Sequence, residues 1–150
     1  MWKGVSALVF GLLLSGCQSL SQSFTRWNSP SSQSLRTITL SGESYTERNP
    51  GDFISWVCRD FVNEGRTLVE VGNFAVPELN DAGFVIYDGG NSGESTHYQR
   101  KGLNLRWDWG PKGSDFAFIL EPDGTGLFYD FSNAEGKTVK ANQVFKCRQK

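Results

Sequence analysis

The sequence predicts an all-β protein: a small antiparallel barrel or sandwich of about eight strands behind a disordered tether. Its 150 residues include eleven Phe, five Trp and four Tyr, spread among seventeen Gly. Aromatic side chains favour strands, and glycines favour the tight turns between them. From Phe53 onward, short stretches of alternating apolar and polar residues recur at a spacing of about ten residues. No stretch shows the apolar stripe of an amphipathic helix.

Turn residues divide this region into its expected strands. Asn49-Pro50-Gly51 precedes the first of them, and Glu121-Pro122-Asp123-Gly124 carries the proline and glycine of a reversing turn. The clearest alternation puts Leu103, Leu105, Trp107 and Trp109 on one face. We expect strands over residues 53–61, 67–74, 83–87, 96–100, 103–109, 116–120, 127–131 and 139–147. Residues 35–40 are a candidate outlying strand, and residues 76–82 are expected to form at most one helical turn.

The start of the chain is typical of a secretory signal. Lys3 precedes an apolar run over residues 5–14, which is shorter than the roughly 20 residues of a membrane span. The run ends in Leu14-Ser15-Gly16-Cys17, which resembles the lipobox of bacterial lipoproteins. That resemblance implies cleavage before Cys17, a diacylglycerol on its sulfur and an acylated amino group. The alternative is an ordinary export signal that happens to end in cysteine.

These signals divide the chain into a signal peptide at residues 1–16, a flexible Ser-rich tether at residues 17–50 and a compact β domain at residues 51–150. Because Gln18 rather than Asp follows Cys17, resemblance to sorted lipoproteins implies the periplasmic face of the outer membrane. The lipid is then the contact with the membrane. After removal of residues 1–16, 14 basic side chains stand against 16 acidic ones. This balance argues against nucleic acid as a partner, because phosphate neutralisation needs a basic face.

Two thiols remain if Cys17 is lipidated. Cys58 and Cys147 stand at the start and the end of the strand-rich region, and an oxidising compartment favours a disulfide between them. The bond would close a loop of about 90 residues, worth roughly 4 kcal/mol in the chain-entropy account. The alternative is a pair of buried free thiols. No CxxC motif or Cys/His cluster is present, so we expect neither a metal nor a cofactor.

Candidate catalytic groups are better explained by structure than by chemistry. His97 is the only histidine, and neither a GxSxG elbow nor a reactive cysteine accompanies it. Paired carboxylates could serve a glycosidase, but here they alternate with aromatic residues or flank turns, as acidic residues on wet strand faces do; they are Asp108, Asp115, Glu121, Asp123 and Asp130. We therefore expect no catalytic residue and no enzymatic activity.

The aromatic residues raise the question of a ligand cavity inside the barrel. Trp107 and Trp109, with the phenylalanines of the following strands, could line an apolar cavity. Small closed barrels of about eight strands either fill with side chains or hold one small ligand. With only about 95 patterned residues, we expect a filled core.

Two segments carry a further resemblance. They run from Ser92 through Gly93 to Tyr98 and from Trp109 through Lys112-Gly113 to Ala117. Together with the flanking cysteines they resemble the MliC family, bacterial lipoprotein inhibitors of c-type lysozyme with a small antiparallel barrel, an early cysteine bonded to a late one and a Ser-Gly-x-x-Tyr loop. This chain has two extra residues before Tyr98 and Pro111 before Lys112.

The MliC resemblance implies a role for three of these residues. It implies that Ser92 and Lys112 reach the carboxylates of the lysozyme cleft and that Tyr98 belongs to the partner-binding loop. A lysine and a hydroxyl can satisfy two carboxylates that water otherwise solvates. The alternative is an ordinary turn lysine and an ordinary loop serine. The sequence thus predicts an anchored binding domain: an inhibitor of a lysozyme-like hydrolase, a structural or assembly factor of an envelope complex, or a binder of a small apolar ligand.

Overall fold

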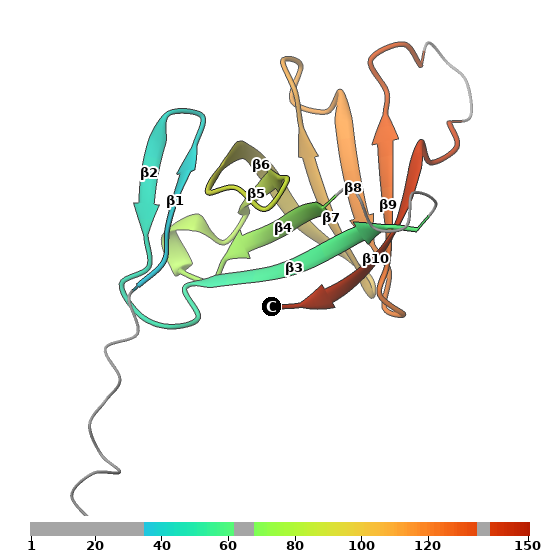
Figure 1. Ribbon diagram of the computed structural model, residues 1–150. Coiled ribbons are helices and arrows are strands. Elements are labelled where there is room, and N and C mark those ends of the chain that lie inside the picture. Colours follow the sequence, from blue (N-terminus) through green and yellow to red (C-terminus); the bar gives the residue numbers. More distant parts are fainter. Residues whose placement is uncertain (1–34, 62–67, 135–138) are drawn as a thin grey trace, which may run out of the picture. The chain divides into compact units, whose positions relative to one another are not determined.

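Eight antiparallel strands, β3 to β10, close into a barrel (Figure 1). The computed structural model describes residues 35–61, 68–134 and 139–150. Within the barrel the strand order is β6-β5-β4-β3-β10-β9-β8-β7, and pairing between β6 and β7 closes the ring. The strands are β1 (Thr37–Leu40), β2 (Glu43–Thr46), β3 (Phe53–Asp60), β4 (Leu68–Phe74), β5 (Ala82–Tyr87), β6 (Ser92–Lys101), β7 (Asn104–Trp109), β8 (Phe116–Leu120), β9 (Thr125–Asp130) and β10 (Gln143–Gln149). The predicted all-β class is confirmed, as a barrel rather than a sandwich.

In the described part of the chain, the helical content is as small as the sequence predicts. One 3-10 turn, η1 (Pro77–Leu79), lies between β4 and β5, inside the segment expected to hold at most one turn. Among the residues that the structure describes, no helix is long and apolar enough to cross a membrane.

The pairing of β6 with β7 shows how the sequence pattern sets the barrel faces. His97 lies opposite Asp108 and Lys101 opposite Asn104, so a tight turn at Gly102-Leu103 joins the two strands. The side chains of Leu105, Trp107 and Trp109 lie on one face, as their alternation predicts. They belong to the larger of two clusters of buried residues in the described ranges, which is called the main core. Leu103 is the exception. It is 81% exposed because it lies in the β6–β7 turn, before β7 begins at Asn104.

Aromatic side chains and the disulfide fill the barrel interior, which confirms the expected filled core. Trp107 is 0% exposed, and its ring contacts those of Trp56, Tyr98 and Phe118. Glycine makes room for this packing. A Cβ built on Gly83 would lie 2.7 Å from Trp107 Cδ1, and one built on Gly126 would lie 2.5 Å from Phe118 Cζ. Both distances are too short for a real side chain, so the rings require glycine at these two positions.

The predicted disulfide is confirmed. Cys58 on β3 and Cys147 on β10 face each other directly across the strand pair and are bonded. The bond lies in the main core and joins the first and the last strand of the barrel in sequence.

A hairpin formed by β1 and β2 extends the sheet beyond the barrel. β1 pairs with β2 and, through Thr39 and Leu40, runs parallel to the start of β6. Its Ile38 and Leu40 are 0% and 1% exposed and belong to a second core. The other buried members of this second core are Phe74, Phe84 and Ile86, from β4 and β5.

The hairpin corrects the predicted tether boundary. Residues 35–50 were expected to belong to the flexible segment, but the folded unit begins at Leu35. Two apolar side chains of residues 35–40, Ile38 and Leu40, are buried because they pack on an apolar outer face of β4 and β5. The rest of the predicted tether, residues 17–34, and the predicted signal peptide lie outside the described residues.

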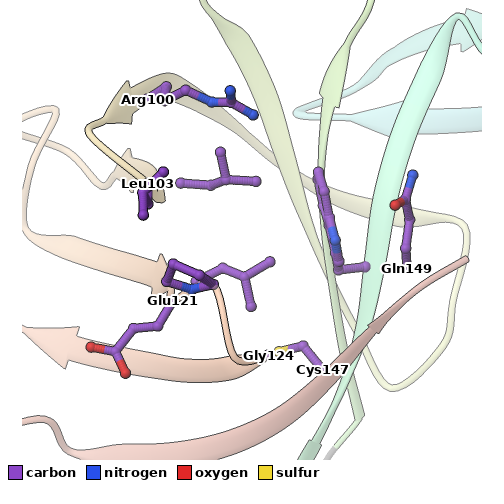
Figure 2. Close-up of a pocket in the computed structure, with 10 residues that line it drawn as sticks. Arg100, Leu103, Glu121, Gly124, Cys147 and Gln149 are labelled. Atoms are coloured by element: carbon purple, nitrogen blue, oxygen red, sulfur yellow. The ribbon is translucent and has the colours of Figure 1, made fainter.

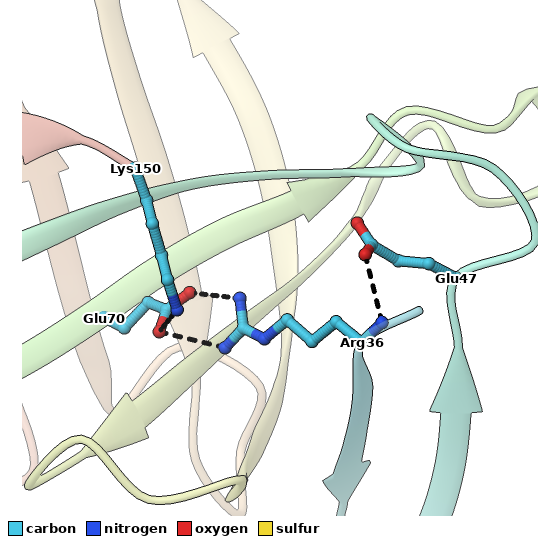
Figure 3. Close-up of polar contacts among 4 residues, drawn as sticks. All are labelled: Arg36, Glu47, Glu70 and Lys150. Carbon is cyan, nitrogen blue, oxygen red and sulfur yellow. Dashed lines mark hydrogen bonds and ion pairs between the residues drawn. The ribbon is translucent and has the colours of Figure 1, made fainter. Parts of the chain in front are cut away.

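An ion-pair cluster fastens the hairpin to the barrel wall (Figure 3). Arg36, just before β1, donates from Nη2 to Glu70 Oε2 at 2.9 Å and also bonds the other carboxylate oxygen. Lys150 Nζ lies 3.3 Å from Glu70 Oε2. Burial acts to raise the pKa of Glu70, but hydrogen bonds from Arg36 and Ser55 and the charges of Arg36 and Lys150 outweigh it, so the pKa is lowered.

Candidate functional site

The two ends of the barrel differ in what they present. The end that holds the start of β6 and the β7–β8 turn is called the Ser92 end. The end that holds the β6–β7 turn, the β8–β9 turn and the end of β10 is called the Leu103 end. The register between β6 and β7 shows which segments share an end of the barrel, because the two strands run antiparallel and His97 pairs with Asp108. The start of β6 at Ser92 therefore lies toward the β7–β8 turn that carries Lys112.

The turn that carries Lys112 is held in a defined shape. Gly110 and Gly113 have φ of 115° and 83°, values that glycine adopts without strain. The Gly113 backbone N–H donates to the Gly110 carbonyl at 2.8 Å, and the Lys112 N–H donates to Asp115 Oδ2 at 2.6 Å. Asp115 thus fixes the backbone, and the exposed lysine stands on an ordered turn.

A hollow of about 570 Å³ opens at the Ser92 end. Its walls come from the β1–β2 turn, the end of β5, the start of β6 and the β7–β8 turn. The lining residues are Ser41, Tyr87, Glu94, Ser95, Trp109, Gly110, Pro111 and Phe116. Burial and then the negative charge of Glu94 raise the pKa of Tyr87, partly offset by a hydrogen bond from Trp109. The hollow is therefore aromatic, with a carboxylate at its edge.

The structure separates Tyr98 from Ser92 and Lys112. Tyr98 is half-buried among the residues that pack on the main core, and its ring centroid lies 5.5 Å from that of Trp107. Its backbone N–H donates to the carbonyl of Asp81 at 2.6 Å. Asp81 belongs to the connection that precedes β5. Of the three proposed partner-binding residues, only Ser92 and Lys112 are exposed and share one end of the barrel.

Four of the five carboxylates singled out in the sequence, Asp108, Asp115, Asp123 and Asp130, have local structural partners. Asp108 is buried and forms a bidentate ion pair with Arg106. The hydrogen bonds to Asp108 raise the pKa of Arg106. Hydrogen bonds from the backbone and hydroxyl of Thr125 lower the pKa of Asp123, and those from Ser132 lower the pKa of Asp130. His97 is exposed on β6. Within the described part of the chain, no three His, Cys, Asp or Glu residues are grouped so as to hold a metal ion.

A second hollow, of about 290 Å³, lies at the Leu103 end (Figure 2). It is lined by Trp56, Arg100, Leu103, Leu105, Leu120, Glu121, Pro122, Gly124, Cys147 and Gln149. None of the predicted partner-binding residues lines it, although the alternation of β6 contains a signal. Arg100 follows Tyr98 by two residues and so shares its face, which puts a cation on the side of the strand that faces the core.

No family model, no curated protein and no solved structure matches this chain.

Proposed function

We propose that this chain is a lipid-anchored binding protein of the cell envelope, held at the periplasmic face of the outer membrane through Cys17. The lipobox resemblance supports the anchor, and the Cys58–Cys147 disulfide suits an oxidising compartment. The barrel is compatible with a non-catalytic binding domain. In the test, Cys17→Ser abolishes labelling of the protein by radioactive or clickable fatty acid in growing cells. Persistent labelling of that variant would remove the anchor assignment.

The partner that we propose is a lysozyme-like hydrolase, bound at the Ser92 end. The observation that supports it is that Ser92 and Lys112, on separate segments, lie at one end of the barrel and are both exposed. Lys112 would pair with one carboxylate of the hydrolase cleft while the Ser92 hydroxyl donates to another. Because the Lys112 turn is ordered by Asp115, little backbone entropy is lost on binding.

The decisive assay is lysis of bacterial cell walls by a c-type lysozyme with the protein in excess. Lys112→Ala weakens inhibition by more than about tenfold, since removing one partner of a desolvated charged contact costs about 2–5 kcal/mol. The matched control is Lys140→Ala, another exposed lysine, which leaves inhibition unchanged. Absence of inhibition at micromolar protein would eliminate the hydrolase as the partner.

The hollow at the Ser92 end provides a second variant for this assay, with the opposite expected effect on inhibition. Glu94 is exposed beside the hollow, and its charge opposes an approaching carboxylate. Glu94→Gln should therefore strengthen inhibition, whereas a partner that does not present carboxylates to this end would give no gain.

A second candidate, an assembly factor of an envelope complex, is favoured by the outer face of β3 and β10. Arg59 lies directly opposite Lys146, and Arg148 follows on the same face. Like charges in this position repel, so a counter-charge on a partner would stabilise them. Phe61, at the end of this face, is 72% exposed. Under this alternative, Arg59→Glu abolishes co-purification of the complex and Lys112→Ala does not.

A further inference from the structure

The hollow at the Leu103 end lies next to the filled core. Trp56, Leu105 and Leu120 belong to its apolar lining, and all three pack with the main core. Its volume of about 290 Å³ is just below the range of small-molecule sites, about 300–1,000 Å³. It therefore suits a ligand with a short apolar body rather than a large cofactor.

One cation is turned toward this hollow. Arg100 lies directly opposite Leu105 in the β6–β7 pair, at the rim of the apolar wall. In Figure 2 its guanidinium extends over the hollow, whereas the carboxylate of Glu121 points away from it. Among residues 35–61, 68–134 and 139–150, Arg100 has no ion pair. The rim thus offers a guanidinium whose fork of donors matches a carboxylate or a phosphate.

We propose that the Leu103 end binds a small amphiphile that has a short apolar chain and an anionic head. The chain lies against Trp56, Leu105 and Leu120, and the guanidinium of Arg100 binds the carboxylate or phosphate. This site is at the opposite end of the barrel from Ser92 and Lys112. It does not depend on the partner proposed for that end.

Four probes that share one chain length test the proposal by isothermal titration calorimetry: octanoate, octyl phosphate, octanol and octylammonium. The titrated protein is the oxidised full chain carrying Cys17→Ser, which has no acyl groups of its own. At least one of the two anions binds saturably and at least about tenfold more tightly than octanol, because a charge-assisted bond adds to apolar burial. Octylammonium binds no better than octanol. The anion that binds more tightly identifies the preferred head group.

Arg100→Gln reduces the affinity for the anion to that for octanol and leaves octanol binding unchanged. The matched control is Arg148→Gln, because Arg148 is an exposed arginine that does not line this hollow and follows the inward-facing Cys147 on β10. This control keeps the affinity for the anion. Equal loss in both variants would overturn the proposal, since it would indicate a general effect of net charge.

Leu103 provides a second test that leaves the core untouched, because its side chain is 81% exposed at the edge of the hollow. Leu103→Asp weakens anion binding and Leu103→Lys strengthens it, while both variants keep the melting temperature of the parent chain. Two results would overturn the proposal: no saturable binding of either anion at millimolar concentration, or equal affinity for the charged and the neutral probes.

Discussion

The indole Nε1 of Trp107 donates a hydrogen bond to the backbone carbonyl of Gly72, 2.7 Å away. Trp107 belongs to β7 and Gly72 to β4, strands that are not neighbours in the sheet, so the buried indole reaches past its neighbouring strands to make this bond. A buried indole needs such a partner, because an unpaired N–H in the core is costly. The bond therefore orients the largest fully buried side chain among the residues that the structure describes.

Trp107→Phe should destabilise the barrel by about 2–4 kcal/mol, because it removes this hydrogen bond and leaves unfilled volume. Urea unfolding followed by circular dichroism measures the loss. Leu103→Ala is the control, because Leu103 belongs to the same alternating series of residues as Trp107 but is exposed. It should change the free energy of unfolding by less than about 0.5 kcal/mol. A loss below about 1 kcal/mol for Trp107→Phe would show that the interior adapts freely.

Gly126→Ala should destabilise the protein by about 1–3 kcal/mol or more through overpacking. The added methyl would lie 2.5 Å from Phe118 Cζ and 2.7 Å from Cys147 Sγ. Gly90→Ala is the matched control, because its nearest neighbour would be 3.6 Å away. Melting temperatures of the two variants should separate clearly, and equal values would contradict the packing described for β9.

Reduction of Cys58–Cys147 should lower stability by about 2–5 kcal/mol, since the bond closes a loop with a sequence separation of 89. Intact-mass measurement with alkylation, before and after reduction, should count one disulfide. A melting temperature that does not change in reductant, with both thiols shown to be alkylated, would contradict this expectation.

Acid should weaken the attachment of the β1–β2 hairpin through Glu70. The pKa of Glu70 is lowered in the folded protein below the ordinary value of 4.5, so its contribution is present above about pH 4.5 and is lost as the pH falls through the folded pKa. Unfolding free energies at about pH 7 and about pH 3 should therefore differ more in the wild type than in Glu70→Gln. Glu78→Gln, at an exposed glutamate, is the control. An identical acid loss in both variants and the wild type would exclude Glu70 as the source.

Hydrogen exchange gives a local reading of the same cluster. In Arg36→Gln, residues 37–46 should exchange faster while the barrel strands keep their protection, because the variant removes the bidentate partner of Glu70. Uniformly faster exchange would show that the hairpin and the barrel unfold together.

Local sequence patterns determined much of this protein. Alternation and turn residues specify short strands with one apolar face, so the all-β class, the inward face of β7 and the single turn of helix were predictable. The two cysteines at the ends of the strand-rich region and the export signal predicted their disulfide. The lipobox rests on residues outside the described part and stays a prediction.

Only the tertiary structure decided what depends on contacts distant in sequence. Residues 35–40 alternate too weakly to be assigned with assurance, and Ile38 and Leu40 are buried because β4 and β5 expose an apolar outer face to them. Tyr98 and Ser92 share one sequence motif, but the length of β6 puts Tyr98 against Trp107 and leaves Ser92 at the barrel end. Arg100 reads as an ordinary strand cation until ring closure brings Trp56, Leu105 and Leu120 beside it. Periodicity fixes which face a side chain takes, whereas closure of the barrel fixes which side chains meet there.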